Sequence, residues 1–128
     1  MRILLDTCTF LWMVSEPKRL SRGARNLVAD PANDLYLSAV SVWEIAIKWG
    51  LGRLELPSAP SQFVRPQREA HGIEALPLDE DAAAHVTSLA ALHGDPFDLM
   101  LVSQAIVHGL ALLTPDERIA RYPARVVW

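Results

Sequence analysis

The stretch from Arg2 to Trp12 reads RILLDTCTFLW, and its pattern changes at one residue, Asp6. Before Asp6, the run Ile-Leu-Leu is continuously apolar, as in a strand that is covered on both faces of a sheet. After Asp6, the apolar residues of 7–14 have the spacing of a helix, which we expect to end near Pro17. The stretch therefore predicts a buried strand that leads directly into a helix, with a carboxylate at the junction.

The same alternation of strands and helices continues along the chain. Further strands are expected at 35–38, 73–76 and 110–113, with an edge strand at 125–127. Helices are expected at 21–29, 40–49, 61–71, 79–92, 96–108 and, briefly, 116–121, although Pro66 casts doubt on the interior of one of them. This order predicts an α/β fold, a three-layer α/β/α sandwich with a mostly parallel central sheet of four to five strands. No repeat or linker interrupts it, so one domain over residues 1–128 is expected.

Composition sets the broad class of the protein. The chain has 128 residues, of which 51% are hydrophobic and 21% charged, as in one compact soluble domain. The sequence contains neither an apolar run of the ~20 residues that a membrane span needs nor a signal-peptide pattern. A single cysteine, Cys8, excludes an intramolecular disulfide and fits a reducing compartment, so a cytoplasmic location is expected. The net charge of -3 argues against a protein that coats nucleic acid, but it leaves room for a local basic patch.

Five acidic residues are expected at one edge of the predicted sheet. Open α/β sheets bind ligands beyond the carboxyl ends of their strands, and these acids follow strands or begin helices there: Asp6, Glu44, Asp95, Asp98 and Asp116. Gathered carboxylates repel one another, which raises their pKa values unless a cation neutralises them. Oxygen ligands without a nearby set of cysteines or histidines favour Mg²⁺ or Mn²⁺ over zinc. The pattern therefore indicates a site for a hard divalent ion.

Some of these acids also have a purely structural explanation. Asp6 and Asp116 each stand where an N-cap is favoured. Glu44 has mostly apolar neighbours, where an unpaired carboxylate is costly, and its structural partner would be Lys48, four residues further along the same helix.

Asp95 and Asp98 also have both a structural explanation and a possible role as metal ligands. Asp95 precedes Pro96, which matches an N-cap followed by proline at the first helical position. Asp98 stands at the third helical position, where an acid stabilises the helix dipole by ~0.3–1 kcal/mol. Both side chains are on neighbouring parts of one helical face, so the spacing alone does not decide which of them is a ligand.

Four segments together carry a resemblance to a known family. They read LLDTCTFLW, SAVSVWEIAIKWGLGRL, HGDPFDLMLVSQA and LALLTPDERIARY, and they span nearly the whole chain. With them the chain resembles the PIN-domain ribonucleases of the VapC type, the toxins of bacterial toxin–antitoxin pairs. The resemblance implies an endoribonuclease that hydrolyses RNA phosphodiester bonds with a water activated by Mg²⁺, or by Mn²⁺. It also implies a homodimer and inhibition by a cognate small antitoxin protein, in a complex that could form a larger assembly.

The resemblance also implies roles for particular residues. Four acids match the catalytic and metal-binding positions of the family: Asp6, Glu44, Asp98 and Asp116. Asp95 is an additional acid, for which the roles of metal ligand and helix cap both stay open. The chain departs from the family at Leu99 and at Val102-Ser103, where relatives often have arginine and the letters IAQA. This departure concerns substrate contact or packing more than the metal site.

Further residues near these acids are candidates for supporting roles. Thr7 and Thr114 adjoin acids and are expected to orient them as hydrogen-bond donors, whereas Ser41 is expected to cap the helix of Glu44. Basic side chains that could contact RNA phosphates, or could simply be solvated surface charges, are Lys18, Arg19, Arg22, Arg25, Lys48, Arg118, Arg121 and Arg125.

Other kinds of site fit the sequence less well. Cys8 has no histidine placed to activate it and is expected to be a small buried side chain, and the four histidines lack zinc-ligand spacing. His93 is not expected to contact substrate. A haloacid-dehalogenase-like phosphatase needs a second aspartate where this chain has Cys8. A non-catalytic interaction module, with the acids as caps and ion pairs, is the other alternative.

Overall fold

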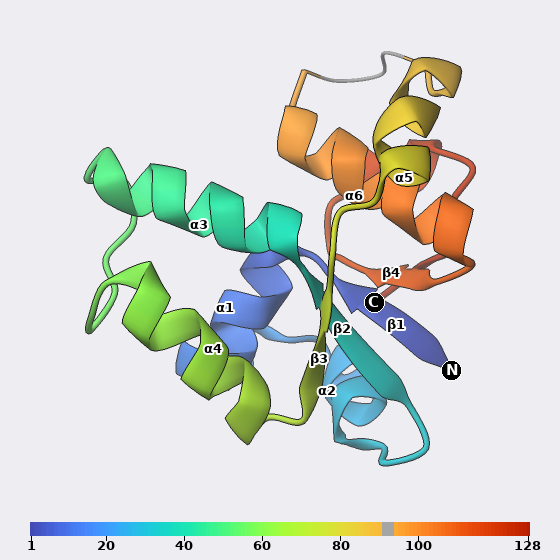
Figure 1. Cartoon of the computed structure of the whole chain (residues 1–128). Helices are drawn as coiled ribbons and strands as arrows, with labels where there is room; N and C mark the ends of the chain where they lie inside the picture. Colours follow the sequence, from blue (N-terminus) through green and yellow to red (C-terminus); the bar gives the residue numbers. More distant parts are fainter. Residues whose placement is uncertain (91–93) are drawn as a thin grey trace.

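The computed structural model describes residues 1–90 and 94–128, and within them a five-stranded parallel sheet forms the centre of the molecule (Figure 1). The strands are β1 (Arg2–Leu5), β2 (Asp34–Ser38), β3 (Ile73–Leu76), β4 (Ala111–Leu113) and β5 (Val126–Val127). Their order in the sheet is β3-β2-β1-β4-β5, and each neighbouring pair is parallel. The predicted parallel α/β sheet is therefore confirmed.

Helices cover both faces of this sheet (Figure 1). They are α1 (Thr7–Ser15), α2 (Arg22–Ala29), α3 (Ala39–Gly50), α4 (Pro60–Ala70), α5 (Glu80–His85) and α6 (Pro96–His108). Successive side chains of a strand point to opposite faces. Leu5 of β1 accordingly packs in one core with Phe10 of α1 and Phe63 of α4, whereas Leu4 packs in the other core with Leu101 of α6. The three-layer arrangement is the predicted one.

The helix predicted at 79–92 is wrong in its length. α5 ends at His85, and a 3₁₀ turn follows at Val86–Ser88. Valine, threonine and serine are weaker helix formers than the alanines before them, and the Thr87 hydroxyl donates a hydrogen bond to the Ala84 carbonyl at 3.1 Å. Residues 91–92 of the predicted helix, and His93, lie outside the described residues. The helix predicted at 116–121 is also shorter, a single 3₁₀ turn at Ile119–Arg121.

Two expectations about helix ends are also corrected. Ser38 caps α3, because its hydroxyl accepts a hydrogen bond from the Val40 N–H at 3.0 Å. Ser41 is therefore inside α3 and does not cap it. α4 continues through Pro66 because Phe63 and Val64 anchor the helix in the core, which outweighs the hydrogen bond that proline cannot donate.

The arrangement of the strands gathers several loops at one edge of the sheet. β1 is central, with β2 on one side and β4 on the other, so the carboxyl ends of these three strands are adjacent. α1 follows β1 directly and α3 follows β2 directly. This edge is the switch point at which α/β folds bind ligands. In the described part of the chain, each helix is too short or too polar to cross a membrane.

Candidate metal centre and active site

Asp6 lies at the carboxyl end of β1 and is almost completely buried, with 4% of its surface exposed. One carboxylate oxygen, Oδ1, accepts a hydrogen bond from the Thr9 N–H at 2.8 Å, so Asp6 caps α1. The other, Oδ2, accepts a hydrogen bond from the Thr114 hydroxyl at 2.6 Å, beyond the neighbouring strand β4. Burial raises the pKa of Asp6, and the hydrogen bonds from Thr114 and Thr9 partly offset that rise. The predicted helix cap by Asp6 is thus present, and the catalytic and metal-binding role of this side chain stays a prediction.

Glu44 reaches the same edge from α3 and is also buried, with 5% exposed. Its Oε1 accepts a hydrogen bond from the Thr7 hydroxyl at 2.7 Å, and Thr7 lies 3.0 Å from the Ser41 hydroxyl. Its Oε2 pairs closely with the Lys48 ammonium. Burial disfavours the charge of Lys48, but this pairing and the nearby acids raise its pKa overall. Glu44 therefore forms the predicted helix pair with Lys48, and its charge also acts on Asp98. Its role in binding a metal stays a prediction.

Asp95 and Asp98 begin α6, and they differ in what they contact. The Oδ1 atom of Asp95 accepts hydrogen bonds from the N–H groups of Phe97, at 2.9 Å, and Asp98, at 3.3 Å. The predicted helix cap is therefore present. Among the described residues, no protein group donates a hydrogen bond to the Asp98 carboxylate.

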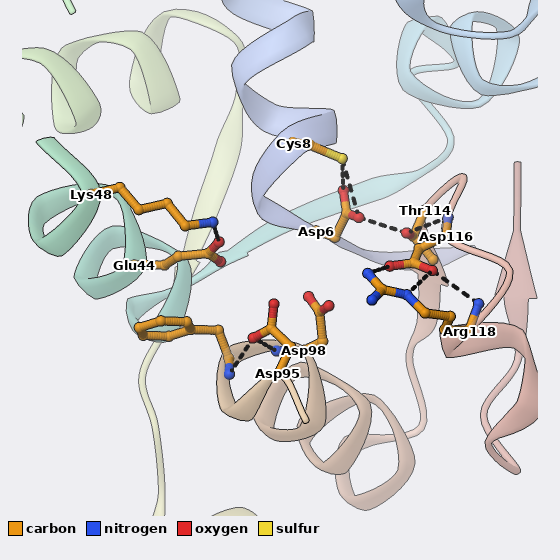
Figure 2. A network of polar contacts seen from close by, with 10 residues as sticks. Asp6, Cys8, Glu44, Lys48, Asp95, Asp98, Thr114, Asp116 and Arg118 are labelled. Carbon is orange, nitrogen blue, oxygen red and sulfur yellow. Dashed lines mark hydrogen bonds and ion pairs between the residues drawn. The ribbon is translucent and has the colours of Figure 1, made fainter. Parts of the chain in front are cut away.

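The charge environment of Asp98 ties the five acids together. Burial and, after it, the negative charges of Asp95, Glu44, Asp6 and Asp116 raise the pKa of Asp98 to about 7. Figure 2 shows these five residues around one shared space, with the Asp6 carboxylate turned toward Cys8 and Thr114. We call these five residues the acidic cluster. The sequence-predicted candidates are thus brought together around a carboxyl group that has an excess of negative neighbours.

Asp116 follows β4 in a turn and is held by Arg118. The guanidinium donates to both carboxylate oxygens, from Nε at 3.2 Å and from Nη2 at 2.9 Å. The Asp116 N–H donates to the Thr114 hydroxyl oxygen at 3.1 Å, and that same hydroxyl donates to Asp6. One threonine therefore connects the acid after β1 with the acid after β4.

The donor chemistry of the acidic cluster fits a hard divalent ion. Five carboxyl groups lie around the shared space, and negative charge gathered beside Asp98, which helps to raise its pKa, favours the addition of positive charge. Within the described residues, no three acidic, histidine or cysteine side chains are already arranged to bind one ion directly. Mg²⁺ usually keeps several waters and binds one or two carboxylates, which suits such an open arrangement. Metal binding by Asp6, Glu44, Asp98, Asp116 or Asp95 stays a prediction.

The structure places two of the eight basic candidates for RNA contact at the acidic cluster. Lys48 and Arg118 contact the acidic cluster. Lys18 and Arg19 instead lie beyond the far end of α1, which is about 14 Å long at ~1.5 Å per residue. Arg19 lies over the Trp12 ring at 4.3 Å and pairs with Glu16 at 3.7 Å. Four further arginines are exposed at the surface: Arg22, Arg25, Arg121 and Arg125. Their contact with RNA stays a prediction.

Two residues that the sequence analysis did not single out connect the helices of the site. The Ser38 hydroxyl, which caps α3, donates to the Gln104 amide oxygen at 2.5 Å, and the Gln104 amide nitrogen donates to the Pro77 carbonyl at 3.2 Å. Gln104 is fully buried in α6. Because α3 carries Glu44 and α6 carries Asp98, this bridge sets the position of one helix relative to the other. Its only signal in the sequence is a polar residue on the apolar side of α6.

Cys8 lies beside Asp6 but is unsuited to nucleophilic chemistry. Its Sγ is 3.4 Å from both carboxylate oxygens of Asp6. Burial, followed by the charge of Asp6, raises the pKa of the Cys8 thiol to about 12. The thiol therefore stays protonated at neutral pH, and the thiolate that would act as nucleophile is not populated.

The fold and the acidic edge agree with the relationships of the sequence. The chain matches the PIN domain family over residues 3–125 and belongs to that family. It is 31% identical over 130 residues to Ribonuclease VapC22 of Mycobacterium tuberculosis (strain ATCC 25618 / H37Rv), an alignment that covers 98% of each chain. It is 38% identical over 61 residues to Ribonuclease VapC16 of the same organism, over 48% of this chain and 43% of that one. The predicted family is confirmed, and the phosphatase alternative has no support.

Solved structures show the same fold. VapBC2 from Rickettsia felis bound to a DNA fragment from its promoter has a TM-score of 0.74 at 15% identity, covering 99% of this chain and 98% of that chain. DNA-bound VapBC from Salmonella typhimurium has a TM-score of 0.69 at 18% identity, covering 99% and 97%. At these identities the likeness concerns the fold alone.

The two roles of Asp95 can be separated by substitution. Asp95→Ser keeps a side-chain acceptor for the first N–H groups of α6, so we expect unfolding free energy close to that of the wild type. Asp95→Ala loses the cap and is expected to cost ~1 kcal/mol. Urea unfolding without divalent ions measures both. A serine variant that keeps its stability but loses RNA cleavage would instead identify Asp95 as a ligand.

The Thr114 hydroxyl is expected to matter for metal affinity. Thr114→Val keeps the shape of this buried side chain but removes the donor to Asp6 and the acceptor of the Asp116 N–H. Loss of such an orienting group typically weakens metal binding ~10–100-fold, which titration calorimetry with Mn²⁺ measures. Thr114→Ser, which keeps the hydroxyl, is the matched control. Equal Mn²⁺ affinity of the valine variant and the wild type would contradict the orienting role.

Proposed function

We propose that this chain is a metal-dependent endoribonuclease and the toxin of a toxin–antitoxin pair. Support comes from the relatives named ribonucleases VapC22 and VapC16 and from membership of the PIN domain family. The observation that carries the proposal is the acidic cluster at the carboxyl edge, where four other acids act on Asp98. That charge arrangement suits a divalent ion more than a purely structural set of helix caps.

The residues of the cluster have distinct parts in this chemistry. We assign Asp6, Glu44, Asp98 and Asp116 as the groups that hold Mg²⁺, or Mn²⁺. When bound, such an ion lowers the pKa of a water and stabilises the charge that develops on a phosphodiester during in-line attack. The Thr114 hydroxyl fixes the orientation of the Asp6 carboxylate, and the Thr7 hydroxyl fixes that of the Glu44 carboxylate. The cap by Asp95 fixes the first turn of α6 and so the position of Asp98.

Cleavage of a circular RNA tests the reaction type directly. A circular molecule has no ends, so only an endonuclease converts it to a linear product. We expect the purified protein with Mg²⁺ to linearise circular RNA and to leave circular single-stranded DNA of the same sequence intact. Glu44→Gln, which keeps the size of the buried side chain, is the control and is expected to be inactive. Equal activity of this variant would show that a contaminating nuclease, or another site, does the cleavage.

The partner in this proposal is a cognate small antitoxin protein. Two solved structures of similar fold are a toxin–antitoxin complex from Klebsiella pneumoniae and VapBC-5 from Mycobacterium tuberculosis, a member of the VapBC family of toxin–antitoxin systems. On this chain, α3 and the residue after it expose large apolar side chains, with Trp43 58% and Leu51 62% exposed. Exposed aromatic and aliphatic groups are common at protein interfaces. We also propose a homodimer in the cytoplasm, where RNA is accessible. Light scattering of the purified chain, alone and with the antitoxin, measures both associations.

A further inference from the structure

Two basic side chains lie against the acidic cluster from opposite sides (Figure 2). On one side, the Lys48 ammonium pairs with Glu44. On the other, the Arg118 guanidinium pairs with Asp116 through two hydrogen bonds. The negative charges of Asp95 and Asp98 act on both cations. The chain thus supplies its own counter-charges to the site.

The two cations are more exposed to solvent than their acidic partners. The Glu44 side chain is 6% exposed and the Asp116 side chain 23%, whereas Lys48 is 45% exposed and Arg118 60%. Both basic side chains can therefore turn toward solvent while the acids stay in place. A long flexible lysine and a planar arginine fork are also the two side chains that best bind phosphate groups.

Charge balance links these cations to the metal. Five carboxyls against two cations leave the cluster with an excess of negative charge, and a divalent ion would reduce that excess. In the proposed function, the carboxylate oxygens that pair with Lys48 or Arg118 are also oxygens to which a metal ion would bind. A bound ion and these ion pairs therefore compete for the same acceptors. The negatively charged phosphates of RNA then become the better partners of the two displaced cations.

We propose that Lys48 and Arg118 are exchangeable counter-ions: they pair with Glu44 and Asp116 before a divalent ion binds, and with RNA phosphates on either side of the scissile bond afterwards. This inference rests on the proposed ribonuclease function. It selects two RNA-binding residues from the eight basic candidates in the sequence. It also predicts that a single substitution raises the affinity for the divalent ion and lowers the affinity for RNA.

The test compares Lys48→Met and Arg118→Met with the wild type in two binding measurements. Titration calorimetry with Mn²⁺ in the absence of RNA is expected to show tighter binding, by about fivefold, because a competitor for the carboxylates is gone. Binding of a fluorescein-labelled RNA oligonucleotide in Ca²⁺, with the RNA shown to be intact on a gel, is expected to weaken by about fivefold. The slope of log affinity against log salt is expected to fall by ~0.7 for each lost phosphate contact.

Lys18→Met is the matched control, because it removes one exposed positive charge outside the cluster. It is expected to leave Mn²⁺ affinity unchanged and to reduce RNA affinity less than either cluster variant. Circular dichroism checks the fold of each variant. Arg118→Met is the variant less expected to disturb the fold, because the Arg118 side chain is largely exposed.

Two results would overturn the proposal: unchanged or weaker Mn²⁺ binding in both cluster variants, or an equal loss of RNA affinity in Lys18→Met. If the wild type cleaves RNA and one of these two results is found, only the proposed counter-ion role of Lys48 and Arg118 fails. If the wild type binds Mn²⁺ but neither binds nor cleaves RNA, the proposed function fails with it.

Discussion

Asp98→Asn is expected to abolish RNA cleavage, with a loss of at least about 100-fold, while the fold remains intact. The loss follows from removing a group that we assign to hold the metal ion, and loss of one electrostatic contact that stabilises a transition state typically costs ~10²–10³ in rate. The fold remains because no protein group among the described residues donates a hydrogen bond to the Asp98 carboxylate. Initial rates with a defined RNA and thermal unfolding of the same samples measure the two effects.

The same variant is expected to become more stable than the wild type as the pH rises. The pKa of Asp98 is about 7 in the folded protein, above the ~3.9 of an unfolded aspartate. Between these values the folded state binds more protons than the unfolded state, so ionisation of Asp98 costs stability as the pH rises. Asparagine does not ionise. Its advantage is therefore absent below about pH 4, grows through this window and is complete above about pH 7.

Urea unfolding in EDTA across this pH range measures the difference. Asp95→Asn is a useful comparison, because Asp95 is one of the charges that raise the pKa of Asp98 but is also the helix cap. A lower stability of Asp98→Asn at about pH 8 would contradict the account. It would mean that the Asp98 charge holds the structure together.

Removal of divalent ions is expected to stop cleavage and to lower the stability of the protein. An ion that binds only the folded state stabilises it by ~2.7 kcal/mol at one hundred times its dissociation constant. For this chain the gain is expected to be larger at about pH 8 than at about pH 5.5, because at the lower pH the ion must displace a proton from Asp98. Thermal unfolding with Mg²⁺ or with EDTA, at each of these two pH values, measures the gain in stability.

The control for this prediction is Asp98→Asn in the same four conditions. We expect it to show a smaller Mg²⁺-induced shift with little pH dependence, because it has lost the titrating ligand. Equal melting temperatures of the wild type in Mg²⁺ and in EDTA at about pH 8 would argue against a metal at the acidic cluster.

Much of the fold follows from local pattern. The run before Asp6 is apolar on both faces because β1 lies at the centre of the sheet, and every residue of Ile3–Leu5 is fully buried. The end of α5 was harder to predict. Its alanines favour a longer helix, but a 3₁₀ turn follows where valine, threonine and serine occur. Pro66 shows the opposite case, since packing of Phe63 and Val64 maintains α4 through a residue that disfavours helix.

The gathering of the acids was predictable because strand topology alone places the ends of β1, β2 and β4 together. The ion-pair partner of each acid was harder to predict. The Glu44–Lys48 pair follows from helical spacing, whereas the Asp116–Arg118 pair depends on a tight turn. The bridge from Ser38 to Gln104 joins residues 66 positions apart. Local propensity carries no information about such a contact, because only the final packing of α6 brings the two side chains together.

Ribonuclease action through the acidic cluster is tested by sequencing RNA ends in cells after induction of the chain. The wild type is expected to create new internal RNA ends that are absent after equal expression of Asp6→Ala. Asp6 is the right control because it directly follows the central strand and its charge acts on Asp98. New internal ends only with the wild type support a ribonuclease that acts through the acidic cluster. Identical ends with both proteins would contradict it.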